Sequence, residues 1–231
     1  MSNRLGDGLV VPVTLPGVIA FLLLLGICYQ AHELGHHFFG GLVCGRLGTV
    51  TLSTYESADG CRRLPDVLTE LFGPFVSLII AYAAALRLRS RPGLLAFGFV
   101  FASYFHLRFI PPLMGGGDEL DVVRKLGFGN LHLTVAIILF LLALPPLAIA
   151  WRSLAAPGRW WTFALIYVLP LPFLWYVDAL AALVSGSKAV FPALASITLL
   201  RIPVTLLVVD VVMIVGFLLL SGVILSRESA R

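Results

Sequence analysis

Charged residues are scarce in this sequence. Of its 231 residues only 12% are Asp, Glu, Lys or Arg, whereas 59% are hydrophobic. So many apolar residues exclude an intrinsically disordered chain and argue against a water-soluble domain. The net charge of +4 is small and is spread over short arginine-containing segments. This distribution is typical of residues that flank membrane spans, and it does not favour a nucleic-acid-binding surface.

Cysteine is also rare. The three cysteines are Cys28, Cys44 and Cys61, and no two of them have the C-x-x-C spacing of many zinc sites. An odd number in this arrangement gives no disulfide framework. We therefore expect neither a structural disulfide nor a cysteine-based metal site.

Long apolar segments take up most of the chain. Six of them approach or exceed the roughly 20 residues that a helix needs to cross the bilayer core. The first is too long for a removable signal peptide and lacks the small-residue cleavage site. We predict one integral membrane domain over residues 1–231, an all-α multi-pass protein in the lipid bilayer of the cell membrane. Its six expected transmembrane helices are Leu15–Phe39, Val67–Leu86, Gly93–Ile110, Leu131–Trp151, Trp160–Val184 and Ile202–Leu225.

A metal-binding pattern lies near the end of the first apolar segment, as His32-Glu33-Leu34-Gly35-His36. Residues four apart share one face of a helix, so both imidazoles can reach one ion. Glu33 falls beside that ion, where it can accept a proton from water. The alternative is that these side chains only form hydrogen bonds within a helix bundle. Ionisable groups inside a membrane span are costly and indicate function, so we predict a site for one Zn²⁺ with Glu33 as the catalytic base.

A catalytic zinc site needs a third protein ligand. Asp118 is the favoured candidate because it follows a triple glycine at the end of the third span, on the same side of the membrane as the histidines. The alternative is that Asp118 is only the N-cap of a short helix, since Asp is a preferred capping residue, although one carboxylate can serve both roles. Asp121 and Asp178 are alternative ligands. His106 is either a supporting residue of the site or a histidine packed in the core.

Three segments resemble the motifs of the site-2 protease family of intramembrane zinc metalloproteases. "AHELGHH" resembles the zinc-binding helix of that family, and "LFGPFVSLIIA" resembles its Gly-Pro-x-x-Asn segment. "FHLRFIPPLMGGGDE" resembles its Asn-x-x-Pro…Leu-Asp-Gly segment, whose aspartate is the third zinc ligand. The resemblance implies a three-helix catalytic core over about 15–127, followed by additional transmembrane helices over about 131–225.

The resemblance also implies supporting roles for Gly73, Pro74 and Ser77 on the second core helix. Ser77 stands where the family usually has asparagine. An ungapped alignment places Met114 where the family has its aspartate, whereas "GGGDELDVVRKLGFG" resembles a divergent branch with a glycine-rich turn before that residue. This second comparison again favours Asp118.

The loop Val43–Asp66 contains a second local pattern. "GTVTLSTY" alternates in the manner of a strand, and "ADG" is typical of a turn. We predict a small hairpin above the metal, where a strand edge can bind an unwound substrate segment through main-chain hydrogen bonds.

The function implied by the resemblance is that of a zinc-dependent endopeptidase in regulated intramembrane proteolysis. Its substrate would be a membrane-embedded segment of a transmembrane protein, cleaved near the cytosolic face. Two alternatives stay open: a catalytically inactive scaffold or regulator that retains a zinc site, and a metal transporter. Nothing in the sequence indicates a particular oligomeric state.

Overall fold

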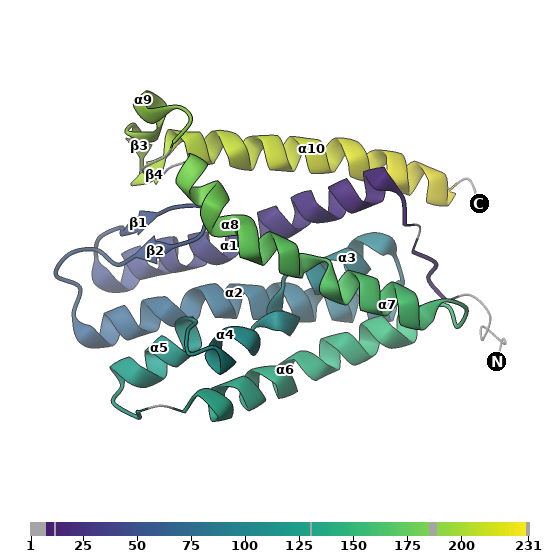
Figure 1. Cartoon of the computed structure of the whole chain (residues 1–231), viewed down its shortest axis with the longest axis horizontal. Helices are drawn as coiled ribbons and strands as arrows, with labels where there is room; N and C mark the ends of the chain where they lie inside the picture. Colours follow the sequence, from purple (N-terminus) through teal and green to yellow (C-terminus); the bar gives the residue numbers. More distant parts are fainter. Residues whose placement is uncertain (1–7, 12, 130, 185–188, 230–231) are drawn as a thin grey trace.

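The computed structural model describes residues 8–11, 13–129, 131–184 and 189–229, without the side chains of residues 63, 173–176, 178 and 223–229. A bundle of long helices carries two short β-hairpins at one end, and the beginning of α1 and the end of α10 lie at the other (Figure 1). The helical elements are α1 (Leu15–Cys44), α2 (Arg63–Ser90), α3 (Leu94–Ala102), the 3₁₀ turn η1 (Phe105–Leu107), α4 (Ile110–Leu113), α5 (Asp118–Lys125), α6 (His132–Ser153), α7 (Arg159–Val168), α8 (Pro170–Val184), α9 (Pro192–Ala195) and α10 (Val204–Ser229). The strands are β1 (Thr49–Val50), β2 (Tyr55–Glu56), β3 (Thr198–Leu199) and β4 (Ile202–Pro203).

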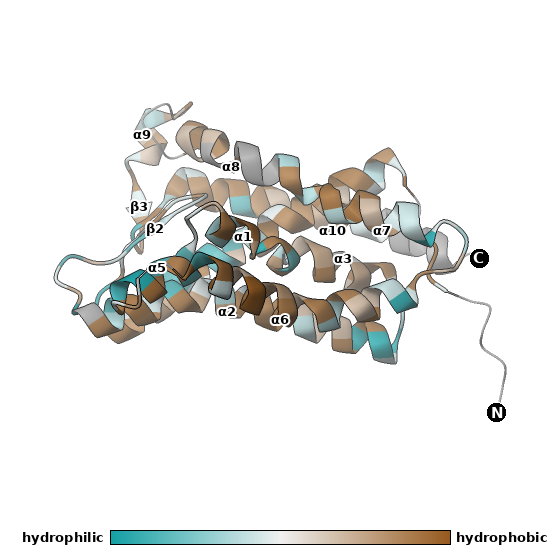
Figure 2. Ribbon diagram, turned by 60° about the horizontal axis from the view of Figure 1, so that its bottom comes forward, coloured by the Kyte–Doolittle hydropathy of each residue, from teal (hydrophilic) through white to brown (hydrophobic). Residues whose placement is uncertain are grey.

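Five segments among the described residues are long and apolar enough to cross a membrane. Apolar residues run along the helices, whereas hydrophilic residues gather toward their ends, most clearly at α5 (Figure 2). Large apolar side chains on the outer faces of α6 and α10 are exposed, a surface that suits lipid and would be unfavourable in water. The prediction of a mainly helical, multi-pass architecture is confirmed at this level. The five segments are Leu15–Cys44, Leu64–Ser90, Leu94–Leu113, His132–Ser153 and Val204–Gly222.

The fifth predicted span, Trp160–Val184, corresponds to two helices in place of one. Helix α7 ends at Val168 and α8 begins at Pro170. Proline has no N–H to donate to the carbonyl of the preceding turn, which explains an interruption at this point. Neither helix alone has the roughly 20 residues of a straight span.

Helix α1 is delimited by strong local signals. The side chain of Thr14 caps its first turn by accepting a hydrogen bond from the Gly17 N–H, and Gly45 ends it in a left-handed conformation with φ 71°. The helix packs most extensively against α2 and α10, which places its polar residues in the interior of the bundle.

The third span is irregular where the site lies. After α3 the chain passes through Tyr104, whose φ of 42° is unusual for a residue with a side chain, and continues as η1 and α4. Non-helical backbone at membrane depth is tolerated where it is buried in protein. Tyr104 and His106 are indeed buried, as is Arg108. The interruption turns this segment toward α1 and α5.

The predicted hairpin is present, but its turn is not where we expected it. Strands β1 and β2 pair antiparallel with Val50 opposite Tyr55, so the chain reverses within 51–54. The Thr51 hydroxyl accepts hydrogen bonds from the Ser53 and Thr54 N–H groups and closes this turn. "ADG" forms a separate turn just before Cys61. A second hairpin, β3–β4, was not predicted.

The expectation that the chain has no disulfide was wrong. Cys44, the last residue of α1, is bonded to Cys61, which lies just before α2. The intervening hairpin folds back on itself and brings its two ends together, a contact that spacing along the chain does not reveal. Cys28 is the free cysteine that makes the count odd, and it is buried. Disulfides persist mainly in oxidising compartments, so this bond argues against the cytosolic position that the resemblance implies for this end of the molecule.

Helices α1 and α10 run antiparallel and bring two polar residues to one level. A Cβ added at Gly216 would lie 3.1 Å from a methyl group of Leu23, which fixes the register of the two helices. Gln30 lies seven residues beyond Leu23, and Asp210 lies six residues before Gly216, so the helical rise places them at about the same level along the two helices. Both amide atoms of Gln30 and the Oδ1 atom of Asp210 are buried without a hydrogen-bond partner among the described residues.

Candidate metal centre

Three ligand atoms from two distant parts of the chain converge at one point. Helix α1 carries His32 and His36, and Asp118 is the first residue of α5. The Nε2 atoms of the two histidines are 3.2 Å apart, and they lie 3.1 and 3.4 Å from the Oδ2 atom of Asp118. Ligand atoms around a tetrahedral zinc ion with bonds of 2.0–2.1 Å are separated by about 3.3 Å. The three residues could therefore hold a metal ion without rearrangement.

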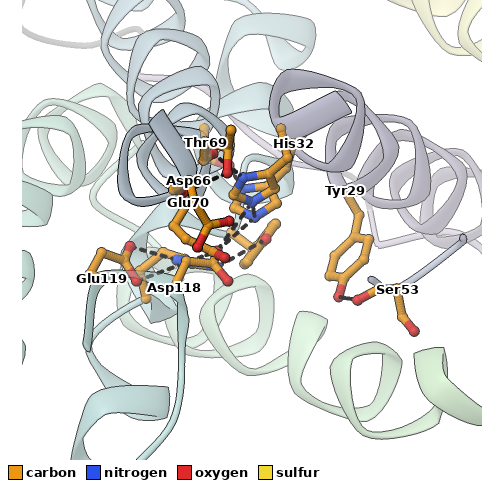
Figure 3. Close-up of polar contacts among 12 residues, drawn as sticks. Tyr29, His32, Ser53, Asp66, Thr69, Glu70, Asp118 and Glu119 are labelled. Atoms are coloured by element: carbon orange, nitrogen blue, oxygen red, sulfur yellow. Dashed lines mark hydrogen bonds and ion pairs between the residues drawn. The ribbon is translucent and has the colours of Figure 1, made fainter. Parts of the chain in front are cut away.

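Both imidazole rings are oriented by contacts to α2. The Nδ1 atom of His36 lies 2.6 Å from the Thr69 carbonyl oxygen, and that of His32 lies 3.1 Å from the Ser77 hydroxyl (Figure 3). A ring that donates its Nδ1–H to an oxygen presents the lone pair of Nε2, and such contacts are usual around metal-binding histidines. Ser77 thus contacts a candidate ligand directly.

Gly73 of α2 lies against both rings. A Cβ at this position would be 2.1 Å from Nε2 of His36 and 2.7 Å from Nε2 of His32, closer than real Cβ atoms approach other atoms. Only glycine lets α2 pass this close to the ligands. The adjacent Pro74 does not interrupt α2, and it lines an apolar groove between α2 and α6.

Glu33 is buried next to this cluster. Its side chain is only 5% exposed, and the charged groups that act on it include His36, Asp118 and Arg108. A carboxylate in this position can exchange protons with a water molecule at the metal ligands. Water has access from the side of Asp118, whose side chain is 27% exposed.

Asp118 is held by an ion-paired network that was not predicted from the sequence. The buried guanidinium of Arg108 donates to Oδ2 of Asp118 at 2.7 Å, and to both carboxylate oxygens of Glu119 at 2.9 and 2.6 Å. Burial alone would raise the pKa of Asp118, but Arg108 and the hydrogen bonds to the two histidines outweigh it and hold that pKa well below its usual range. One signal in the sequence could have revealed this network: Arg108 is a single arginine inside an apolar span, and such an arginine needs a buried acidic partner.

Aromatic rings surround the ligands on the side of the hairpin. Tyr55 of β2 is stacked on the ring of His36, with centroids 5.8 Å apart. Tyr104 lies 5.7 Å from the ring of His32 and stacks on Tyr29. The Tyr29 hydroxyl reaches the Ser53 carbonyl group of the hairpin turn (Figure 3). The hairpin thus covers the metal ligands on one side.

The other candidates lie elsewhere. Asp121 is half exposed and pairs with Arg124 on the same helix. His106 is packed between the rings of Phe101 and Tyr167, away from the three ligands. The side chain of Asp178 lies outside the part of the chain that the structure describes.

Comparisons of this chain with protein-family models, with curated proteins and with solved structures find no match.

Proposed function

We propose that this chain is a zinc-dependent membrane endopeptidase similar to the site-2 proteases. The observation that carries the proposal is the convergence of the His32, His36 and Asp118 ligand atoms at the separations of a tetrahedral zinc site. Three protein ligands with a fourth position open are the arrangement of catalytic zinc sites. Glu33 beside them supplies the acid–base group that a purely structural site does not need.

The proposed reaction is hydrolysis of a peptide bond in a membrane-embedded protein segment. A bound zinc ion would supply Lewis acidity toward the substrate carbonyl and the attacking water. Glu33 takes a proton from that water as its oxygen bonds to the carbonyl carbon. It then delivers the proton to the amide nitrogen as the C–N bond breaks. His32, His36 and Asp118 would hold the ion.

Metal content is the first experiment. Protein purified in detergent under zinc-replete conditions should contain about one zinc per chain. His36→Ala and Asp118→Ala should lose it, because each leaves two protein ligands. A wild-type protein without zinc would refute the proposal. Full zinc in Asp118→Ala alone would move the third ligand to Asp121 or Asp178.

Glu33→Gln distinguishes the protease from a scaffold that retains zinc. The amide keeps the shape of the side chain but cannot accept a proton. A protease should therefore keep its zinc and lose cleavage of a transmembrane substrate by a factor of about 10² or more. If the variant retains the wild-type effect on its partners in cells, the scaffold interpretation is correct.

A further inference from the structure

Arg108 is a cation buried inside an apolar span. It follows η1 in the irregular second half of the third span and is 6% exposed. Removing an arginine from water is costly unless its charge is paired and its N–H groups find acceptors. Here four contacts supply them: two to Glu119, one to Asp118 and one, at 3.3 Å, to the Tyr104 hydroxyl.

The two carboxylates are not equivalent partners of Arg108. Glu119 accepts hydrogen bonds on both of its oxygens, the planar paired geometry that fixes a guanidinium in one orientation. Asp118 accepts only one, and it does so on Oδ2, the oxygen that faces both imidazoles. Glu119 therefore holds Arg108, and Arg108 in turn holds the oxygen that would bind the metal.

We propose that Arg108 is a positioning residue for the third metal ligand, with Glu119 as the residue that orients it. Short helix α5 starts at Asp118 after a run of three glycines and has no side-chain cap. Without Arg108 the aspartate would be free to turn away from the histidines. The proposal rests on the metal-binding part of the proposed function and is independent of proteolysis.

The experiment measures zinc affinity by competition with a coloured chelator, together with the thermal unfolding of the metal-free protein. We expect Arg108→Gln to bind zinc about 10–100-fold more weakly, the usual effect of losing a contact that orients a ligand. Arg108→Lys should recover part of this loss, since it keeps the charge but not the paired geometry. Glu119→Gln should weaken binding less than Arg108→Gln does. Arg124→Gln is the matched control, because it breaks an exposed ion pair on the same helix by the same Arg-to-Gln change, and it should bind like wild type.

A structural role alone gives a different pattern. It would lower the unfolding temperature of the Arg108 and Glu119 variants while the folded protein kept its zinc affinity, and that result overturns the proposal. Cobalt(II) adds a spectroscopic signature, since its visible absorption changes when a carboxylate ligand is displaced. If Arg108→Gln does not fold, Arg108→Lys and Glu119→Gln decide the question by the same two measurements. Zinc-free wild type refutes the metal site itself, whereas tight binding by every variant refutes only the role of Arg108.

Discussion

Replacing Gly73 by alanine is predicted to abolish metal binding without unfolding the protein. The added Cβ would lie 2.1 Å from Nε2 of His36, whereas real Cβ atoms stay at least 3.0 Å from their neighbours. The ring must therefore move by about 0.9 Å, the difference between these two distances. A zinc site tolerates errors of only about 0.2 Å in its bond lengths, so the two histidines can no longer share one ion. Their rings are side-chain ends that can turn, which is why we expect the helices to stay packed.

Helix propensity favours the same substitution, so a loss of zinc binding in Gly73→Ala could not be explained by a weaker helix. Alanine favours a helix interior over glycine by up to about 1 kcal/mol, less at a position before proline. Gly98→Ala in α3 is the matched control, because its Cβ would meet only a Leu24 methyl group at an ordinary 3.4 Å. Chelator competition should show zinc binding at least 100-fold weaker in Gly73→Ala, on the order of 3 kcal/mol, and unchanged in Gly98→Ala. Wild-type zinc affinity in Gly73→Ala would refute the geometry of the site.

Three further predictions concern packing and orientation. Gln30→Leu and Asp210→Leu should each raise the unfolding temperature, because each removes a buried polar group that has no hydrogen-bond partner among the described residues; a lower unfolding temperature in either variant would show that the group is paired. Lys125 donates hydrogen bonds to the carboxylates of Asp66 and Glu70 on α2. Burial lowers the pKa of Lys125, but these two bonds raise it by more, so its pKa lies above the ordinary 10.5. Lys125→Met should then lower the free energy of unfolding by about 1 kcal/mol at most. The difference from wild type should be present at neutral pH and should disappear as the pH rises through the raised pKa of Lys125. Cys44 and Cys61 should resist a thiol reagent until the protein is reduced, and immediate labelling of both in unreduced protein would contradict the disulfide.

The parts of the site that could be predicted are those encoded locally. His32, Glu33 and His36 lie within five residues of one helix, so their common position follows from helical geometry alone. The same holds for the spans, whose length and hydropathy are properties of continuous segments. The break between α7 and α8 depends on one proline in an apolar run, and hydropathy does not register it.

The parts that could not be predicted depend on long-range pairing. Arg108 and Glu119 are eleven residues apart, the first just after η1 and the second on α5, and the left-handed Tyr104 and the glycine run shape the chain around them. The Cys44–Cys61 bond likewise depends on how a loop folds. No periodicity encodes such contacts, and only the cost of burying an isolated arginine signals that a partner must exist.

Asp118 could be either a helix cap or a metal ligand, and the preceding residue, Gly117, decides between these roles. Gly117 takes the N-cap position of α5, with a φ of 92° that disfavours any side chain. A Cβ there would also lie 2.9 Å from that of Pro111. Asp118 is therefore the first residue inside the helix, where a negative charge is favoured by the helix dipole. Because its oxygens are not used to cap the backbone, Oδ2 is free to lie between Arg108 and the histidines, and the aspartate is available as a ligand.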